Sequence, residues 1–268
     1  ASNRAQDVRA GGGSAGVGRG TIAQVDLTGV AAANAVTLAS SELRGAQLTV
    51  AGNEAAQVNA TGGSALANTM SFTDHRLAGG ASYQPAISGN TARNVQAWGG
   101  EGSILSGALA DVRVSASALA NSLSVTRGEL AQAPVHRVSG NRASDVVATG
   151  GGAAANSLWL DNATERAGSV LLAGNTAEQV RTAGASGSVG GGLVGGFERN
   201  GRALANTTVA DHQSTLERAA ITLAGNQAKS VTGSGGLAAA NSAMVTEGRV
   251  QGTCLLYTSP SPRDQRGS

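Results

Sequence analysis

Apolar and polar residues alternate in several short stretches of the chain. In AQLTV at 46–50, Ala46, Leu48 and Val50 fall on one side, with Gln and Thr between them, and AAITL at 219–223 alternates in the same way. A period of two residues is typical of a half-buried β-strand. The Gly and Asn residues between such stretches favour turns because both tolerate positive φ. The pattern therefore predicts an all-β chain of short strands.

A Gly-Asn pair recurs along the chain inside a fixed frame of small and apolar residues. Ala stands two residues after each Asn, Val stands five after it, and Gly stands nine after it. A branched apolar residue precedes each Gly-Asn pair by two positions. Such columns predict an internal repeat. The pairs are Gly52-Asn53, Gly89-Asn90, Gly140-Asn141, Gly174-Asn175 and Gly225-Asn226, with Ser2-Asn3 as a variant.

A second motif, Ala-Asn, is interleaved with the first. Apolar residues often follow it in alternation, as with Met70 and Phe72 after Asn68. This alternation again predicts a strand directly after each Asn. The pairs are Ala33-Asn34, Ala67-Asn68, Ala120-Asn121, Ala155-Asn156, Ala205-Asn206 and Ala240-Asn241.

The spacing of these Asn residues predicts the length of a repeat. The steps from Asn3 to Asn34, from Asn90 to Asn121 and from Asn175 to Asn206 are the long ones, and Gly residues near 18–20, 107 and 190–192 mark their middles. If each long step hides one unmarked turn, the chain contains about 14 steps of about 17 residues, which is too short for a helical hairpin repeat. We therefore expect a repetitive β-solenoid (β-helix) with short coils of about 17 residues, Asn ladders and Gly turns. At one strand spacing per coil, the rod would be about 65–70 Å long.

Other folds are weaker interpretations of the same pattern. AGNTAEQVRTA at 173–183 contains good helix formers, but Gly recurs every few residues, and each costs about 1 kcal/mol inside a helix. A different all-β repeat and a partly disordered chain remain as alternatives.

One repetitive β-solenoid domain is expected over residues 1–253. Its super-repeats cover about 3–89, 90–174 and 175–253, and the last is expected to be truncated. The segment 254–268 departs from the repeat, and its CLLYTSPSPRD is what a transposase-type sequencing-library adapter encodes. We interpret this segment as a translated adapter artefact and exclude it from the argument.

Composition narrows the possible functions. The chain has 40 Gly but only 2% aromatic residues, so we expect a thin core of small side chains. The one cysteine, Cys254, lies in the excluded segment, which leaves no disulfide or thiolate metal site. Charges are scattered without interleaved aromatics, so no nucleic-acid partner is expected. No apolar run is long enough for a transmembrane helix.

The recurring Asn residues are the candidate site positions. We expect their side-chain amides to stack from coil to coil as a structural ladder rather than to bind a ligand. No catalytic, cofactor-binding or metal-binding residue is predicted. The ladder residues are Asn53, Asn68, Asn90, Asn121, Asn141, Asn156, Asn175, Asn206, Asn226 and Asn241.

The histidines and tryptophans invite functional interpretations that the sequence does not support. His75, His136 and His212 lack the further ligands that a metal site needs, so we expect solvated polar positions. Trp98 and Trp159 are expected to cap a coil interior. Asp and Glu occur singly, without a carboxylate pair at recurring spacing.

The chain resembles repetitive bacterial surface proteins, above all the holdfast anchor proteins (D component) of stalked alphaproteobacteria. The resemblance rests on AGNEAAQVNATGGSALAN at 51–68, SGNRASDVVATGGGAAAN at 139–156 and AGNQAKSVTGSGGLAAAN at 224–241. It implies a secreted, outer-membrane-associated surface protein that fixes an adhesive polysaccharide to the cell. No catalytic residue and no cofactor come with it.

Three functions therefore stand side by side. The first is a non-enzymatic anchor or adhesin stalk, with polysaccharide or sister surface proteins as partners and possible self-association. The second is an amyloid-like fibre subunit. The third, less favoured, is a β-helix enzyme that degrades polysaccharide, which would need acidic residues converging in one groove.

Overall fold

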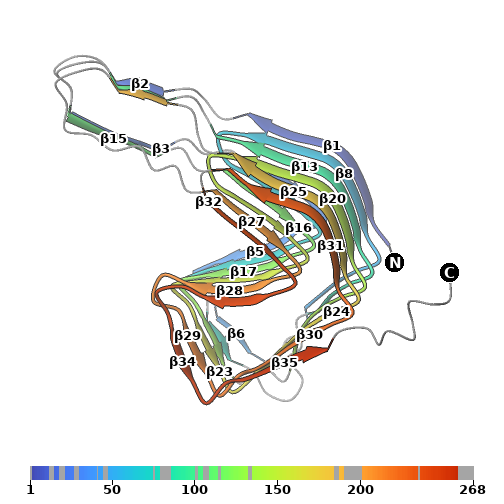
Figure 1. The fold of residues 1–268 in the computed structure, drawn as a ribbon. Coiled ribbons are helices and arrows are strands. Elements are labelled where there is room, and N and C mark those ends of the chain that lie inside the picture. Colours follow the sequence, from blue (N-terminus) through green and yellow to red (C-terminus); the bar gives the residue numbers. More distant parts are fainter. Residues whose placement is uncertain are drawn as a thin grey trace.

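The chain folds as a stack of parallel β-strands. The computed structural model describes residues 2–11, 15–17, 22–26, 30–40, 42–44, 48–74, 76–78, 86–99, 102–104, 109–113, 116–131, 135–183, 187–189, 201–234 and 236–258. Every regular element within these ranges is a strand, and every strand pair is parallel and in register. The expected all-β solenoid is therefore confirmed (Figure 1).

Six coils make up the stack. Each coil begins at a residue of the Gly-Asn column and returns to lie beside its own start. The Asn residues that begin successive coils are 50, 37, 51, 34 and 51 residues apart. Long and short coils therefore alternate.

Two sheets face each other over one side of each coil. The outer sheet contains β1 (Arg4–Gly11), β8 (Glu54–Thr61), β13 (Thr91–Trp98), β20 (Arg142–Thr149), β25 (Thr176–Ala183) and β31 (Gln227–Gly233). The inner sheet contains β4 (Val30–Ala33), β9 (Ser64–Ala67), β16 (Ser117–Ala120), β21 (Gly152–Ala155), β27 (Gly201–Ala205) and β32 (Gly236–Ala240).

Three further sheets enclose the other side of the coil. The middle sheet contains β5 (Val36–Ala39), β10 (Met70–Thr73), β17 (Leu123–Thr126), β22 (Leu158–Asp161), β28 (Thr208–Asp211) and β33 (Ala243–Val245). The lower sheet contains β6 (Glu42–Arg44), β11 (Arg76–Ala78), β18 (Glu129–Ala131), β23 (Thr164–Arg166), β29 (Thr215–Glu217) and β34 (Arg249–Gln251). The return sheet contains β7 (Thr49–Ala51), β12 (Ala86–Ser88), β19 (His136–Ser139), β24 (Ser169–Ala173), β30 (Ala220–Ala224) and β35 (Cys254–Thr258).

The long coils carry an extra arm between their outer and inner strands. One arm sheet contains β2 (Ala15–Val17), β14 (Gly102–Ile104) and β26 (Gly187–Val189), and the other pairs β3 (Ile22–Asp26) with β15 (Leu109–Arg113). Figure 1 shows β2, β3 and β15 projecting to one side of the stack. The unmarked turn that was expected inside each 31-residue step corresponds to this arm. The Gly residues expected to mark it at 18–20, 107 and 190–192 lie outside the described residues.

The space between the outer and inner sheets is filled by small side chains. The Ala and Val columns of the Gly-Asn motif point into it from the outer sheet, as Ala55 and Val58 do, and both are fully buried. Alternate Ala residues of the inner sheet, such as Ala65 and Ala67, meet them. Small residues on both sides let the two sheets approach closely, so this compartment matches the expected thin core.

The space enclosed by the middle, lower and return sheets holds larger side chains. Met70 and Phe72 point into it from the middle sheet, Leu130 from the lower sheet, and Ile87 and Leu172 from the return sheet. All five are at most 1% exposed. The expectation of a core made only of small residues is therefore wrong for this compartment, because three sheets around one space leave more volume to fill than two facing sheets do.

The outer sides of the inner and middle sheets meet in a corner. Leu119, Leu204 and Val209 pack there together with Trp159. The indole of Trp159 lies against Gly152, where an added Cβ would come within 2.6 Å of the ring. Trp159 therefore fills this outer corner, and Trp98 is 39% exposed on the outer sheet. The expectation that both tryptophans cap a coil interior is wrong.

Residues with positive φ form the corners of each coil. Gly52, Gly89, Gly140, Gly174 and Gly225 make the turn from the return sheet to the outer sheet, with φ between 58° and 64°. The Ala-Asn column makes the turn from the inner to the middle sheet, with φ between 48° and 53°. Gly and Asn are the residues that adopt this conformation at least cost, which explains why both columns recur.

A coil is longer than the 17 residues expected from the Asn spacing. The strand after Asn53, β8, pairs with β13 after Asn90, whereas the strand before Asn68, β9, belongs to another sheet of the same coil. The two motifs therefore mark two corners of one coil, because the chain must pass around both compartments before it returns. Six coils span five steps of about 4.8 Å, or about 24 Å in place of the expected rod of about 65–70 Å.

One ion pair is buried in the larger compartment. Nε2 of His136 lies 2.9 Å from Oε2 of Glu165, and their side chains are 1% and 0% exposed. The register places Glu165 in the column of Leu130 and Leu216, and His136 beside Val170. His136 is therefore not the solvated residue that the sequence predicts. His212 is exposed, and His75 lies outside the described residues.

We expect His136 and Glu165 to stabilise the fold only as a pair. His136→Val should lower the free energy of unfolding by about 3–5 kcal/mol, because it leaves the Glu165 carboxylate buried without its partner. The double variant His136→Val/Glu165→Leu should recover most of this loss, since buried ion pairs can be replaced by well-packed apolar residues at little cost. Urea denaturation of both variants measures the difference. A double variant less stable than His136→Val would contradict this assignment.

Candidate functional site

The first Asn ladder runs along the turn between the return and outer sheets. Oδ1 of Asn141 accepts hydrogen bonds from the backbone N and Nδ2 of Asn90, at 3.0 and 3.1 Å. Nδ2 of Asn141 donates to Ile87 O at 2.9 Å and to Oδ1 of Asn175 at 3.1 Å. The amide thus pairs on both faces with neighbouring coils. The same column contains Asn53, Asn90, Asn141, Asn175 and Asn226.

The second Asn ladder runs along the turn between the inner and middle sheets. Nδ2 of Asn121 donates to Oδ1 of Asn156 at 3.0 Å, and Nδ2 of Asn68 donates to Oδ1 of Asn121 at the same distance. Asn121 and Asn156 are both fully buried. The column contains Asn68, Asn121, Asn156, Asn206 and Asn241, and Asn34 precedes them.

The second ladder also joins the two sides of the coil. Nδ2 of Asn121 donates to Arg142 O at 2.9 Å, and Nδ2 of Asn156 donates to Thr176 O at 2.9 Å. Each acceptor is the residue that follows a first-ladder Asn. The two ladders therefore lie side by side and form a polar layer that separates the two compartments. Because the amides of the interior coils are buried and bonded, they hold the scaffold.

A column of hydroxyl residues reinforces the second ladder. Oγ of Ser157 donates to Ala155 O at 2.8 Å and accepts a bond from the backbone N of Thr207 at 3.2 Å. Ser122 has the equivalent position one coil earlier and accepts from Ser157 N at 3.1 Å. This column was not predicted from the sequence. Its signal was a Ser or Thr directly after most Ala-Asn pairs.

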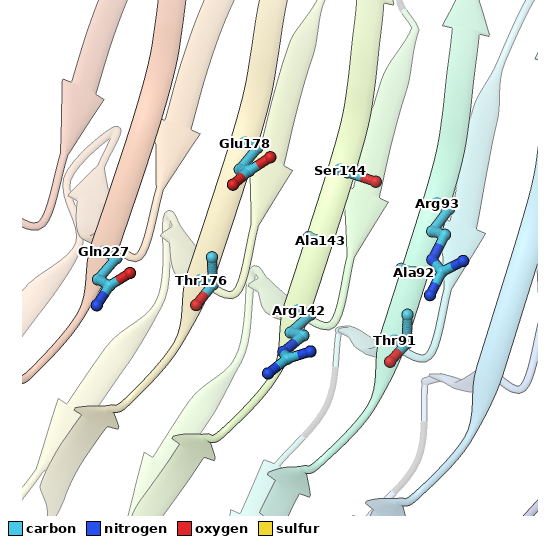
Figure 2. A pocket seen from close by; sticks show the side chains of 9 residues that line it. All are labelled: Thr91, Ala92, Arg93, Arg142, Ala143, Ser144, Thr176, Glu178 and Gln227. Carbon is cyan, nitrogen blue, oxygen red and sulfur yellow. The ribbon is translucent and has the colours of Figure 1, made fainter. Parts of the chain in front are cut away.

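The outward face of the outer sheet carries the candidate binding surface. A shallow depression of about 370 Å³ crosses strands β13, β20, β25 and β31. Figure 2 shows its side chains standing in two rows across neighbouring strands. Its lining residues are Thr91, Ala92, Arg93, Arg142, Ala143, Ser144, Thr176, Glu178 and Gln227. We call this surface the outer depression.

The register explains how these side chains come together. Thr91, Arg142, Thr176 and Gln227 are successive partners across four strands and form the first row. Their positions follow directly after the first Asn ladder, so the ladder fixes their spacing. The second row lies two residues further along each strand, and in the depression it contains Arg93, Ser144 and Glu178. All of these side chains point outward because the Ala between the two rows points into the core.

A second cluster of charged groups lies at the corner of the inner and middle sheets. Asp161 and Asp211 are register partners on β22 and β28. Nδ1 of His212 lies 2.8 Å from Oδ1 of Asp161 and 3.3 Å from Oδ2 of Asp211. Arg202 forms an ion pair with Asp211, whose side chain is 1% exposed. Arg202 and His212 thus both contact the carboxylates of this cluster.

This carboxylate pair is not visible in the sequence, where Asp and Glu are scattered singly, because a pair in neighbouring coils is separated along the chain by the length of a whole coil. Only the observed coil length brings Asp161 and Asp211 into register.

A bidentate ion pair also joins two coils at the turn from the middle to the lower sheet. Nε and Nη2 of Arg127 donate to Oδ1 and Oδ2 of Asp74 at 2.7 and 2.9 Å. These hydrogen bonds hold the pKa of the Asp74 carboxyl below its usual range and raise the pKa of Arg127. The contribution of this pair to stability is complete above the ordinary carboxyl pKa and is lost as the pH falls through the lowered value. Both side chains are largely exposed, so that contribution is small.

The described residues contain no group of three or more His, Cys, Asp or Glu side chains placed to hold a metal ion. Nor does the described part of the chain form a helix long and apolar enough to cross a membrane. Comparison with protein-family models, curated proteins and solved structures gave no match.

We expect the buried amides to dominate local stability. Asn156→Ala removes the hydrogen bonds that its amide makes with Thr176 O, Nδ2 of Asn121 and Oδ1 of Asn206, and a buried group that loses its partner costs about 1–3 kcal/mol. The loss in the free energy of unfolding should therefore exceed about 3 kcal/mol, with faster hydrogen exchange in the coils on both sides.

Asn162→Ala is the matched control for this prediction. Asn162 has nearly the same φ, 49° against 52°, but its side chain is exposed. Its substitution should cost only about 1–2 kcal/mol from the positive φ. Equal losses in the free energy of unfolding for the two variants would show that backbone conformation, and not the ladder, explains the recurring Asn column.

Proposed function

We propose that the protein is a non-enzymatic structural protein of the bacterial cell surface that holds an adhesive polysaccharide. It would act as an anchor or stalk on the outside of the cell, in association with the outer membrane. The sequence resemblance to holdfast anchor proteins suggests this role. The outer depression is the observation that carries it, since it offers a row of polar groups to a long, hydroxyl-rich ligand.

The geometry of the outer sheet suits a polymer better than a small molecule. Its depression is shallow and runs across four strands, along the axis of the stack. Small-molecule sites are usually concave pockets that bury most of the ligand. One coil step of about 4.8 Å is close to the length of one sugar ring in an extended polysaccharide. A sugar chain lying along the axis could therefore meet equivalent groups from successive coils.

The chemistry of the surface also suits this ligand. Thr91, Ser144, Thr176 and Gln227 offer hydroxyl and amide groups that both donate and accept hydrogen bonds. Ladders beneath the strands hold these groups at fixed spacing, so little ordering entropy is lost on binding. The interaction of each group is weak, and binding strength would come from the number of coils that one polymer spans.

The corner cluster gives less support to a polysaccharide-degrading enzyme. A glycosidase needs two carboxylates free to act on opposite sides of a bond. Asp161 and Asp211 are instead bridged by His212, and Asp211 is also paired with Arg202. We therefore favour binding over cleavage.

We expect the full chain to bind extended polysaccharides, with affinity rising as the oligosaccharide lengthens up to about four sugars, because each sugar meets one further coil of the depression. Thr176→Trp should weaken binding, since the indole fills the depression. Binding is measured by surface plasmon resonance on a panel of bacterial surface polysaccharides and their size-graded fragments.

Thr215→Trp serves as the control for this experiment. Thr215 lies in the same coil, on the lower sheet, with a similar half-buried threonine side chain. It should leave binding unchanged. The proposal fails if no polysaccharide binds, if both tryptophan variants bind equally, or if the chain releases new reducing ends from the polymers.

A further inference from the structure

We propose that the outer depression selects an acidic polysaccharide, with one sugar carboxylate held between Arg93 and Arg142. This inference rests on the proposed function and names the ligand class of the same surface. It does not follow from the scaffold, whose ladders are uncharged. It depends instead on where the two guanidinium groups lie and on the groups that surround them.

The two arginines approach the same part of the depression from neighbouring coils. Arg93 is on β13 and Arg142 is on β20, and the register pairs Thr91 with Arg142 and Arg93 with Ser144. The arginines are therefore diagonal neighbours, one coil step apart. Figure 2 shows both side chains on the outward face, on either side of the Ala92–Ala143 pair. A planar carboxylate suits this place because a guanidinium donates paired hydrogen bonds to it.

Neither arginine is paired with an acidic side chain in the part of the chain that the structure describes. Thr91 and Thr176 flank Arg142 in its row, and Ala56 and Ser144 flank Arg93. Among the described residues, no carboxylate lies within ion-pair distance of either guanidinium. Both side chains are exposed.

Most other outward arginines of the described ranges are paired with an acid. Arg4 lies 3.4 Å from Glu54, Arg127 binds Asp74, and Arg166 lies 3.5 Å from Glu217. Arg93 and Arg142 are diagonal neighbours on adjacent coils, so an anionic group between them would be attracted by both guanidinium groups. The outer depression thus places two guanidinium groups without an acidic partner on neighbouring strands.

The acidic group next to the arginines limits the charge density of the ligand. Glu178 follows Ser144 in the second row, one coil beyond Arg142, and its register partner on the next strand is Lys229. A dense polyanion such as DNA carries one charge per about 1.7 Å, so its charges would also face Glu178. A polymer with a carboxylate on some sugars and hydroxyl groups on the rest can place its charge at the arginines and neutral groups along Thr176, Glu178 and Gln227. This pattern favours a uronate-containing polysaccharide over nucleic acid or a heavily sulfated glycan.

The test compares one polymer with and without its charge. Polygalacturonate and its fully methyl-esterified form share a backbone, but only the first carries carboxylates. We expect the full chain to bind polygalacturonate at least about tenfold more tightly than the ester at moderate salt, because charge-assisted hydrogen bonds are lost with the carboxylates. The preference should shrink as salt is added.

Charge-matched variants test the residues. Arg93→Gln/Arg142→Gln should abolish the preference for polygalacturonate over its ester, because the carboxylates then lose their charged partners. Arg137→Gln/Arg249→Gln removes the same charge from exposed positions on the return and lower sheets and should keep the preference. All four substitutions lie on exposed side chains, and hydrogen exchange of the outer sheet confirms that each variant is folded.

Each outcome separates this inference from the proposed function. Equal binding of both polymers, or a preference that survives in Arg93→Gln/Arg142→Gln, overturns the inference and leaves polysaccharide binding intact. Tighter binding to heparin or DNA than to polygalacturonate also overturns it. Binding to no polysaccharide at all defeats the proposed function itself.

Discussion

Hydrogen bonds between one coil and the next are the constraint on which the structure depends. Every turn of the chain leaves backbone groups that need partners, and a buried group without one costs about 1–3 kcal/mol. In the two Asn columns a single side chain pairs with the coil before it, the coil after it and the backbone. Asn141 makes all of these bonds at once. A residue that must do this in every coil can hardly vary, and the interior of the solenoid repeats for that reason.

The position of the second ladder divides each coil into two parts. Asn121 and its equivalents donate hydrogen bonds to backbone carbonyls at the start of the outer sheet, so the two sides of the coil approach each other between the two compartments. On one side, two facing sheets leave room only for Ala and Val. On the other, three sheets surround a space that takes Leu, Ile, Met and Phe. The buried pair of His136 and Glu165 is tolerated there because Nε2 of His136 lies 2.9 Å from the Glu165 carboxylate.

Outward positions are free of these constraints, and the chemistry of the molecule is therefore concentrated on them. The rows of the outer sheet inherit their spacing from the ladder beneath, while their side chains differ from coil to coil. The unpaired Arg93 and Arg142 and the neighbouring Glu178 give the outer depression a charge pattern that the interior does not dictate. The buried scaffold and the proposed binding surface thus occupy the two faces of the same strands, which is the arrangement that alternation along a β-strand permits.

The sequence by itself determined the all-β fold, the residues of the ladders and the inward columns, because turns and buried positions accept few side chains. Val58 and Asn121 were identifiable from their spacing alone. Only the tertiary structure decided which repeats stack, since similar motifs at two corners of one coil give the same spacing signal as two successive coils. The coil length, the Asp161–Asp211 pair and the diagonal placement of Arg93 and Arg142 all follow from that pairing. Contacts between residues 34 to 51 positions apart depend on how far the chain travels around the core, and local pattern does not record that path.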